Sequence, residues 1–303
     1  MSSTPIDLSR LPAPDVIETI DFETLLEQRK ARLVELYPEA DQDAVSAALR
    51  MESEPMSILL QENAYREMVL RQRVNDAARS VMLAYATRKD LEHLAALFDI
   101  ERLTLSPADH ERNIAAVYES DDALRKRTQL APRGFSVAGP EAAYVSHALN
   151  TDAHVLDATA ISPAPCEVLV TILSRDGDGT ASRELIDAVT AALQADDVRP
   201  LTDRVTVQGA EIIKYSVEAA ITTFPGPDAS VVLNEARSRL FHYVESVRRL
   251  GREVTLSGIY AALHVDGVER VTIESPQGNL RISRSQAPYC DGVWISHAGV
   301  YGQ

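Results

Sequence analysis

One acidic loop in the sequence has the residue types of a calcium site. Residues 176–180 read Asp-Gly-Asp-Gly-Thr, so two carboxylates alternate with glycine between a predicted strand and a predicted helix. An EF-hand loop needs glycine at its sixth position and glutamate at its twelfth, where this chain has Ala181 and Asp187. A glycine-rich turn explains the same residues without a metal, and we therefore expect no metal site in this loop.

No other part of the sequence has the spacing of a catalytic or metal site. The seven histidines are scattered, with no HExxH motif and no pair four residues apart. Nucleophile-elbow, Walker and dinucleotide-binding motifs are absent. Cys166 and Cys290 lie far apart without a CxxC motif, which favours two reduced thiols. We therefore expect no catalytic residue, no cofactor and no metal, and we expect that the protein is not an enzyme.

The charge of the chain disfavours one class of partner. A net charge of −15 would be repelled by the phosphates of nucleic acid. Much of the acid lies at the front, because residues 1–60 hold 12 Asp or Glu against 5 Lys or Arg. The sequence has no basic-then-apolar signal segment and no apolar run of about 18 residues. We expect a soluble protein of the cytoplasm without a nucleic-acid or membrane partner.

The front of the chain, residues 1–105, is predicted to be a helical assembly region. Residues 2–14 are polar with three prolines, which predicts an extended arm that becomes ordered on a partner. Residues 22–36 have the apolar spacing of an amphipathic helix. A second helix follows, and Asp41 or Asp43 is placed to cap it.

The middle of this region is predicted to pack as a joint between two further helices. Pro55 suits the first turn of a helix that would be about 45–50 Å long if it continued unbroken to Ala86. Thr87 and Asp90 have the spacing of a capping box for the next helix. The predicted apolar stripe of the long helix consists of Val74, Ala77, Ala78, Val81, Met82 and Tyr85. The predicted buried face of the short helix consists of Leu91, Leu94, Ala95 and Phe98.

Apolar residues on the front helices are the candidate interface. They recur at helical spacing on an acidic segment, which is the pattern of a helix that packs against another helix. The same pattern would also result from a bundle formed within one chain, and the pattern alone does not decide between the two. The candidate interface residues are Phe22, Leu25, Leu26, Leu33, Leu36, Met56, Leu59 and Leu60.

The back of the chain alternates between strand and helix patterns. Residues 106–139 are predicted to be a connecting subdomain. Residues 140–210 and 211–275 are each predicted to be a small α/β sandwich unit, with helices on one face of a sheet. The fold class is therefore α+β, with a long-helix bundle segment at the N-terminus.

Residues 276–303 are predicted to form an extended C-terminal tail. Glycine, proline and scattered single apolar residues dominate this stretch. Short strands are expected around residues 280–282 and 292–296. Trp294, the one tryptophan of the chain, is predicted to be a packing anchor.

Four segments resemble a known family. Residues 83–86 (LAYA), 90–95 (DLEHLA) and 98–102 (FDIER) look like the signature of the Baseplate J-like family, and residues 286–290 (QAPYC) continue the likeness. The resemblance extends more weakly along most of the chain. The family often has glycine at two corners where this chain has Arg88 and Asp99, so these corners must form without a residue that adopts positive φ freely.

The resemblance implies a structural subunit of a contractile-tail baseplate. In that family, two copies combine with one related partner in each wedge, and their N-terminal helices form a bundle. The C-terminal domains meet neighbouring wedges in a ring around the hub, and a sheath-initiating, lysozyme-like wedge protein docks nearby. Such a protein would be assembled in the bacterial cytoplasm, would remain in the baseplate of the released particle, and would rearrange when the tail fires.

Two other classes compete with this interpretation. A cytoplasmic enzyme with an acidic cleft between the two α/β units is the alternative, and it would be a compact single species in solution. A DNA-binding tail component is disfavoured by the negative charge. A structural subunit would instead be oligomeric, insoluble or partly disordered when alone.

Overall fold

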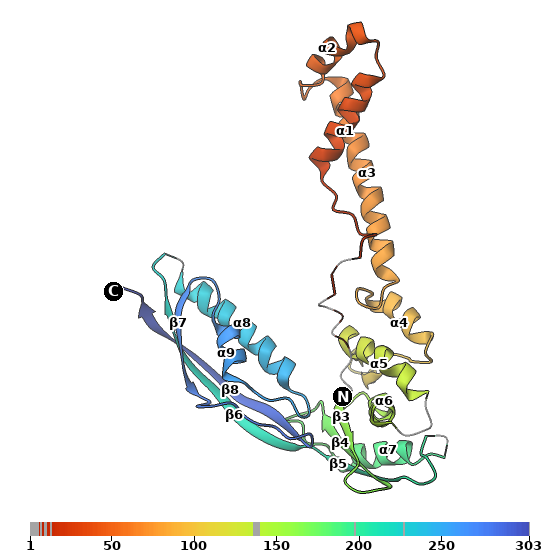
Figure 1. Cartoon of the computed structure of the whole chain (residues 1–303), viewed down its shortest axis with the longest axis vertical. Coiled ribbons are helices and arrows are strands. Elements are labelled where there is room, and N and C mark those ends of the chain that lie inside the picture. The colour runs from red at the N-terminus through yellow and green to blue at the C-terminus, as the bar shows by residue number, and fades with distance from the viewer. Residues whose placement is uncertain are drawn as a thin grey trace. The chain divides into compact units, whose positions relative to one another are not determined.

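The structure is a computed structural model that describes residues 6, 8, 11, 12, 14–135, 140–196, 198–226 and 228–302. Most of the predicted N-terminal arm lies outside these residues. The described chain divides into two compact units, with the boundary between Glu101 and Arg102. The first is helical, and the second contains all three sheets of the described chain, of which the two larger ones are labelled in Figure 1.

The helical unit is built from amphipathic helices whose ends are set by local signals. The Asp21 carboxylate accepts the amide of Thr24 at 2.8 Å and caps the first helix, and Pro55 opens the third as predicted. The second helix has no side-chain cap, because Pro38 and not Asp41 or Asp43 precedes it. The helices are α1 (Phe22–Glu35), α2 (Glu39–Ala48), α3 (Pro55–Ser80) and α4 (Arg88–Ala96).

Helix α3 is shorter than predicted, because it ends at Ser80 and not at Ala86. Its 26 residues correspond to about 39 Å at 1.5 Å per residue. Beyond it the amides of Met82 and Tyr85 donate to carbonyls three residues earlier, at 3.1 and 2.9 Å. Such i→i+3 bonds tighten the backbone into turns and end the regular helix.

The predicted capping box of α4 does not form. Thr87 occupies the N-cap position, but its side chain makes no cap hydrogen bond. The next residue, Arg88, has φ +52°, so the first helical position is left-handed and the Thr87 hydroxyl is not presented to the amide of Asp90. Leu91 is fully buried as predicted, whereas Leu94 is only half-buried.

Residues 102–135, the connecting segment before the first α/β unit, begin the second unit and carry a short hairpin and a helix. Strand β1 (Thr104–Ser106) pairs antiparallel with β2 (Val117–Tyr118), and α5 (Asp121–Gly134) follows. Ser120 caps α5 by accepting the amide of Ala123 at 3.3 Å. The connecting segment is thus ordered by its own hairpin and by a capped helix.

The first α/β unit is a three-stranded sheet with strand order β3-β4-β5. β3 and β4 are antiparallel, and β4 and β5 are parallel, so α7 is the crossover between them. Leu130 of α5 joins this core, which ties the connecting helix to the sheet. The elements are α6 (Glu141–Thr151), β3 (Val155–Ile161), β4 (Glu167–Ser174), α7 (Arg183–Leu193) and β5 (Arg204–Gly209).

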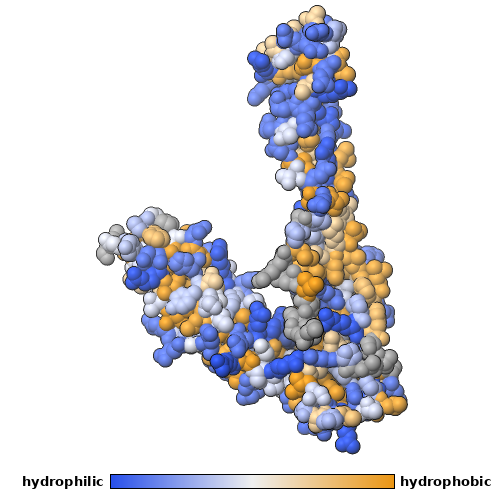
Figure 2. Space-filling view, viewed as in Figure 1, coloured by the Kyte–Doolittle hydropathy of each residue, from blue (hydrophilic) through white to orange (hydrophobic). Residues whose placement is uncertain are grey.

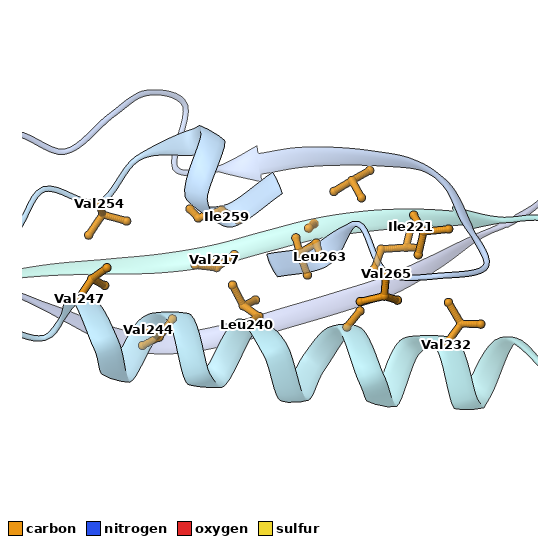
Figure 3. Close-up of a cluster of buried hydrophobic side chains, with 14 of the residues drawn as sticks. Val217, Ile221, Val232, Leu240, Val244, Val247, Val254, Ile259, Leu263 and Val265 are labelled. Carbon is orange, nitrogen blue, oxygen red and sulfur yellow. The ribbon is translucent and has the colours of Figure 1, made fainter. Parts of the chain in front are cut away.

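The second α/β unit is a three-stranded sheet with strand order β7-β6-β8. Alternate residues of the central strand, among them Val217 and Ile221, point into one core with Leu240 and Ile259 (Figure 3). Both helices of the unit therefore cover the same face of the sheet. The elements are β6 (Glu211–Thr223), α8 (Ala229–Val247), α9 (Leu256–Leu263), β7 (Val268–Ser275) and β8 (Gln286–Val300).

The predicted C-terminal tail is wrong over most of its length, because residues 286–300 form strand β8. This strand lies parallel to β6, with partners from Glu211 to Thr223, so its backbone is paired within the sheet. Residues 280–282 contribute only a single bridge, between Leu280 and Val254. Trp294 is 57% exposed, and its ring lies against Gly292, so it is not a buried packing anchor.

Candidate assembly surface

The helical unit is held together by a small core between α1 and α3. Leu25 and Leu26 of α1 pack on Ala64 of α3, which has no exposed surface. Alanine at this position lets the two helices approach closely. Ile20, Phe22, Leu60 and Met68 pack around this cluster.

A chain of ion pairs runs beside this core. Glu67 of α3 accepts hydrogen bonds from Arg29 of α1 and, at 2.9 Å, from Arg71 one turn further along α3. Arg71 also contacts Glu18 at 3.1 Å. The hydrogen bond from Arg29, followed by that from Arg71, lowers the pKa of Glu67 below its ordinary value. These contacts connect α1, α3 and the segment before α1.

Asn75 fixes the chain that leads into α1. Its Nδ2 donates to the carbonyl oxygen of Glu18 at 2.9 Å, and its Oδ1 accepts the amide of Glu18 at 3.1 Å. Asn75 is only 3% exposed. The sequence analysis missed this residue, although a lone asparagine on the buried side of a long helix was the available signal.

The structure divides the predicted interface residues between two environments. Leu25 and Leu26 are buried within the chain, and Phe22 and Leu60 are half-buried against them. Leu33 and Met56 are also half-buried. In contrast, Leu36 and Leu59 are 65% and 61% exposed. Of the eight predicted interface residues, only Leu36 and Leu59 are exposed enough to contact a partner chain.

A larger apolar surface lies on α3 and the turn after it. We call it the α3 stripe, and its residues are Leu59, Leu70, Val74, Ala77 and Val81. The last four follow the four–three–four spacing of a coiled-coil seam. At 3.6 residues per turn, Leu70 points roughly 120° away from Ala64 and hence away from α1. Hydrophobic side chains reach the surface along α3 in Figure 2.

The exposure of this stripe corrects one prediction and adds to another. The stripe from Val74 to Tyr85 was predicted to pack inside the chain, but Val74 and Val81 are 62% and 69% exposed. Their helical unit supplies no described residue that covers them. Leu70, 66% exposed, was not predicted as an interface residue.

The acidic loop between β4 and α7 is a turn whose carboxylates already have partners. Asp178 accepts from the hydroxyl of Thr180 at 2.7 Å and from Lys214 at 3.2 Å. These contacts, the Thr180 hydrogen bonds first, lower the pKa of Asp178 to about 2. Asp176 contacts Nδ1 of His154 at 2.7 Å. The two carboxylates are therefore engaged with different groups.

Other candidate chemistry is sparse in the described part of the chain. No three His, Cys, Asp or Glu side chains of these residues gather as a metal site would require. Cys166 is exposed, and burial raises the pKa of the Cys290 thiol. None of the described helices is long and apolar enough to cross a membrane.

Comparisons with known proteins agree along the chain. Residues 52–109 match the Baseplate J-like N-terminal domain, and residues 136–209 match the Baseplate J-like central domain. Residues 215–296 match the Baseplate J-like protein C-terminal domain.

A curated relative supports the same family, and one solved structure is weakly similar. A chain of the anti-feeding prophage baseplate, solved by cryo-EM, has a TM-score of 0.40 and 16% identity, over 59% of this chain and 43% of that one. Baseplate protein J of Escherichia phage P2 is 47% identical over 287 residues, which are 94% of this chain and 95% of that protein. The chain belongs to the Baseplate J-like family.

Proposed function

We propose that this protein is a structural wedge subunit of a contractile-tail baseplate. Its relative in phage P2 is a baseplate protein, and the relationship covers nearly the whole of both chains. The observation that carries the proposal is the α3 stripe. An exposed apolar seam of this length on an otherwise polar helix is typical of a surface that another helix covers.

The occupant of the α3 stripe is a helix of another baseplate chain. Two copies of this protein and one related wedge protein would assemble through their helical units, as the family resemblance implies. The second α/β units would meet neighbouring wedges, and the sheath-initiating, lysozyme-like protein would dock on the completed wedge. Assembly would take place in the bacterial cytoplasm, and the chain would act without catalytic chemistry.

The test compares two substitutions that end in the same residue. Leu70→Glu places a charge on the α3 stripe, whereas Gln72→Glu places the same charge on an exposed position of α3 outside it. Each variant is co-expressed with the neighbouring baseplate genes and analysed by size-exclusion chromatography. We expect the Leu70 variant to leave the complex and the Gln72 variant to remain in it.

The milder variant Leu70→Ala measures how much the Leu70 side chain contributes to assembly. Burying one leucine contributes about 1.5–3 kcal/mol, so its loss should weaken assembly roughly tenfold to a hundredfold. A Leu70→Glu chain that elutes in the complex at the wild-type ratio would mean that assembly uses another surface.

A further inference from the structure

A cavity of about 100 Å³ lies where the connecting segment meets both α/β units. The first turns of α5, the end of α6 and the start of β3 line it, together with Arg175 after β4 and Arg249 after α8. A single water needs about 10–15 Å³ of such space, so the cavity has room for a small ion. Four basic and three acidic side chains line it, whereas the alternative interpretation expected an acidic cleft between the two α/β units.

Two guanidinium groups at this cavity have no described carboxylate within ion-pairing distance, although Glu119 and Asp176 attract Arg175 from further away. Arg175 donates from Nε to the carbonyl oxygen of Ala153 at 3.1 Å, and Arg249 donates from Nη1 to the carbonyl oxygen of Arg248 at 3.0 Å. Within the described chain, no carboxylate makes an ion pair with either of them. Both side chains are half-buried. Burial, followed by repulsion from Arg249, lowers the pKa of Arg175.

The acidic side chains at the cavity are already committed elsewhere. Glu119 is buried in an ion pair with Arg127 and also accepts the amide of Leu103 at 3.0 Å. Asp152 accepts the amide of His154 at 2.8 Å. The third acid of the lining is bonded within its own helix, to an arginine three residues on.

The lining also contains one ammonium group, on Lys126, and this group is paired with a carboxylate outside the lining. Lys126 contacts Asp157 at 2.8 Å, and the second oxygen of Asp157 accepts the amide of Leu250 at 3.1 Å. The acidic side chains of the lining and Lys126 thus already have partners. Arg175 and Arg249 are the basic side chains of the lining that make no ion pair within the described chain.

We propose that this cavity binds one small oxyanion of the phosphate type through Arg175 and Arg249. Planar guanidinium groups can hold phosphate oxygens with two parallel hydrogen bonds each. An anion here relieves the repulsion between the arginines. It also links the end of β4 to the segment after α8, beside the contact from Asp157 to Leu250. The inference is independent of the α3 stripe.

The experiment is a calorimetric titration of the full chain with inorganic phosphate, at constant ionic strength and at a pH where phosphate is mainly dianionic. We expect saturable binding of one phosphate per chain. Arg175→Met and Arg249→Met should each weaken it at least about tenfold. Arg252→Met removes a fully exposed arginine outside the cavity lining and should bind as the wild type does.

A charge reversal at Arg249 provides a second test if a methionine variant folds poorly. Arg249→Glu would place a carboxylate beside Arg175, so it should unfold at a higher temperature than Arg249→Met in chloride buffer and should bind no phosphate. Acetate should bind more weakly than phosphate, because it carries one charge. Equal phosphate affinity in the wild type and Arg249→Met, no saturable binding, or equal binding of acetate would each overturn the assignment.

Discussion

Asn75 uses both ends of its side-chain amide to hold the backbone of Glu18, far from it in sequence. Asp157 does the same for other segments, because its two oxygens accept from Lys126 and from the amide of Leu250. Both side chains are buried, so their partners replace water. At these two positions a single polar residue decides where distant parts of the chain meet.

Asn75→Asp should release the segment that precedes α1. The substitution keeps the size of the side chain but replaces the donor that faces the Glu18 carbonyl with a second acceptor. Leaving buried polar groups unpaired costs about 1–3 kcal/mol. Amide hydrogen exchange at Glu18 should therefore accelerate, while Gln72→Glu on the exposed side of α3 leaves it unchanged. Unaltered protection of Glu18 would show that Asn75 does not hold the segment.

Asp178 should titrate with a pKa of about 2 in the folded protein. The unfolded chain has the ordinary value near 4, so it takes up the proton first as the pH falls. The stabilisation from Asp178 is thus complete above about pH 4 and is lost as the pH falls towards about 2. NMR titration of the Asp178 carboxyl carbon would measure this directly.

Two variants separate the causes of that shift. The hydrogen bonds from Thr180 are the larger cause and the contact with Lys214 the smaller. Thr180→Ala should therefore raise the pKa of Asp178 more than Lys214→Met does. A folded-state value at the ordinary aspartate pKa would contradict the described contacts.

The end of α4 is a Schellman-type cap built without glycine. The amide of Ile100 donates to the carbonyl of Ala95 at 3.2 Å, and that of Asp99 donates to Ala96 at 3.2 Å. Asp99 has φ +58°, the left-handed conformation in which glycine is usual. Asp99→Gly should thus stabilise the protein by about 1 kcal/mol, read as a higher urea midpoint. A lower midpoint would indicate that the Asp99 side chain contributes more than its backbone strain costs.

The start of α4 should respond differently from its buried face. Thr87 makes no cap hydrogen bond, so Thr87→Ala should change the free energy of unfolding by less than about 0.5 kcal/mol. Leu91 is fully buried, so Leu91→Ala should cost about 2–5 kcal/mol. Urea denaturation of the two variants compares them, and equal losses would contradict the described cap.

The spacing of apolar residues predicted most helices and strands of this chain, because in these elements the apolar face is also the face that packs. The helix predicted over residues 22–36 forms as α1, and Pro55 opens α3 as predicted. Strand β8 was predicted only around residues 292–296, because its pairing partner, β6, is remote in sequence and its own alternation is weak. The end of α3 depends on turns after Ser80 that no propensity marks.

The sequence also does not show which apolar side chains of the front helices are exposed. Helical spacing shows that α1 and α3 carry apolar faces, but not which face meets its own chain. Leu25 and Leu26 are covered by α3, whereas Leu59 is open. Choosing between them requires knowing that Ala64 allows α1 to approach one side of α3.

The boundary between the compact units predicts where the chain can be cut. Residues 102–303 contain both three-stranded sheets and α5, whose Leu130 lies in the core of the sheet β3-β4-β5. A fragment of residues 102–303 should unfold in one cooperative step. A fragment of residues 140–303 loses α5 and its contact from Lys126 to Asp157, and should be less stable by several kcal/mol. Circular dichroism during urea denaturation would compare them, and equal midpoints would show that α5 is dispensable.

The parallel pairing of β6 with β8 also determines when the second three-stranded sheet can be completed during translation. Residues 224–285, which include β7, are synthesised between these two strands, so the edge of β6 that pairs with β8 stays unpaired until residues 286–300 follow. Unpaired strand edges are sites of wrong association. A nascent chain in a polysome is therefore exposed to its neighbours for that interval, and a product that stops short of β8 carries the open edge permanently.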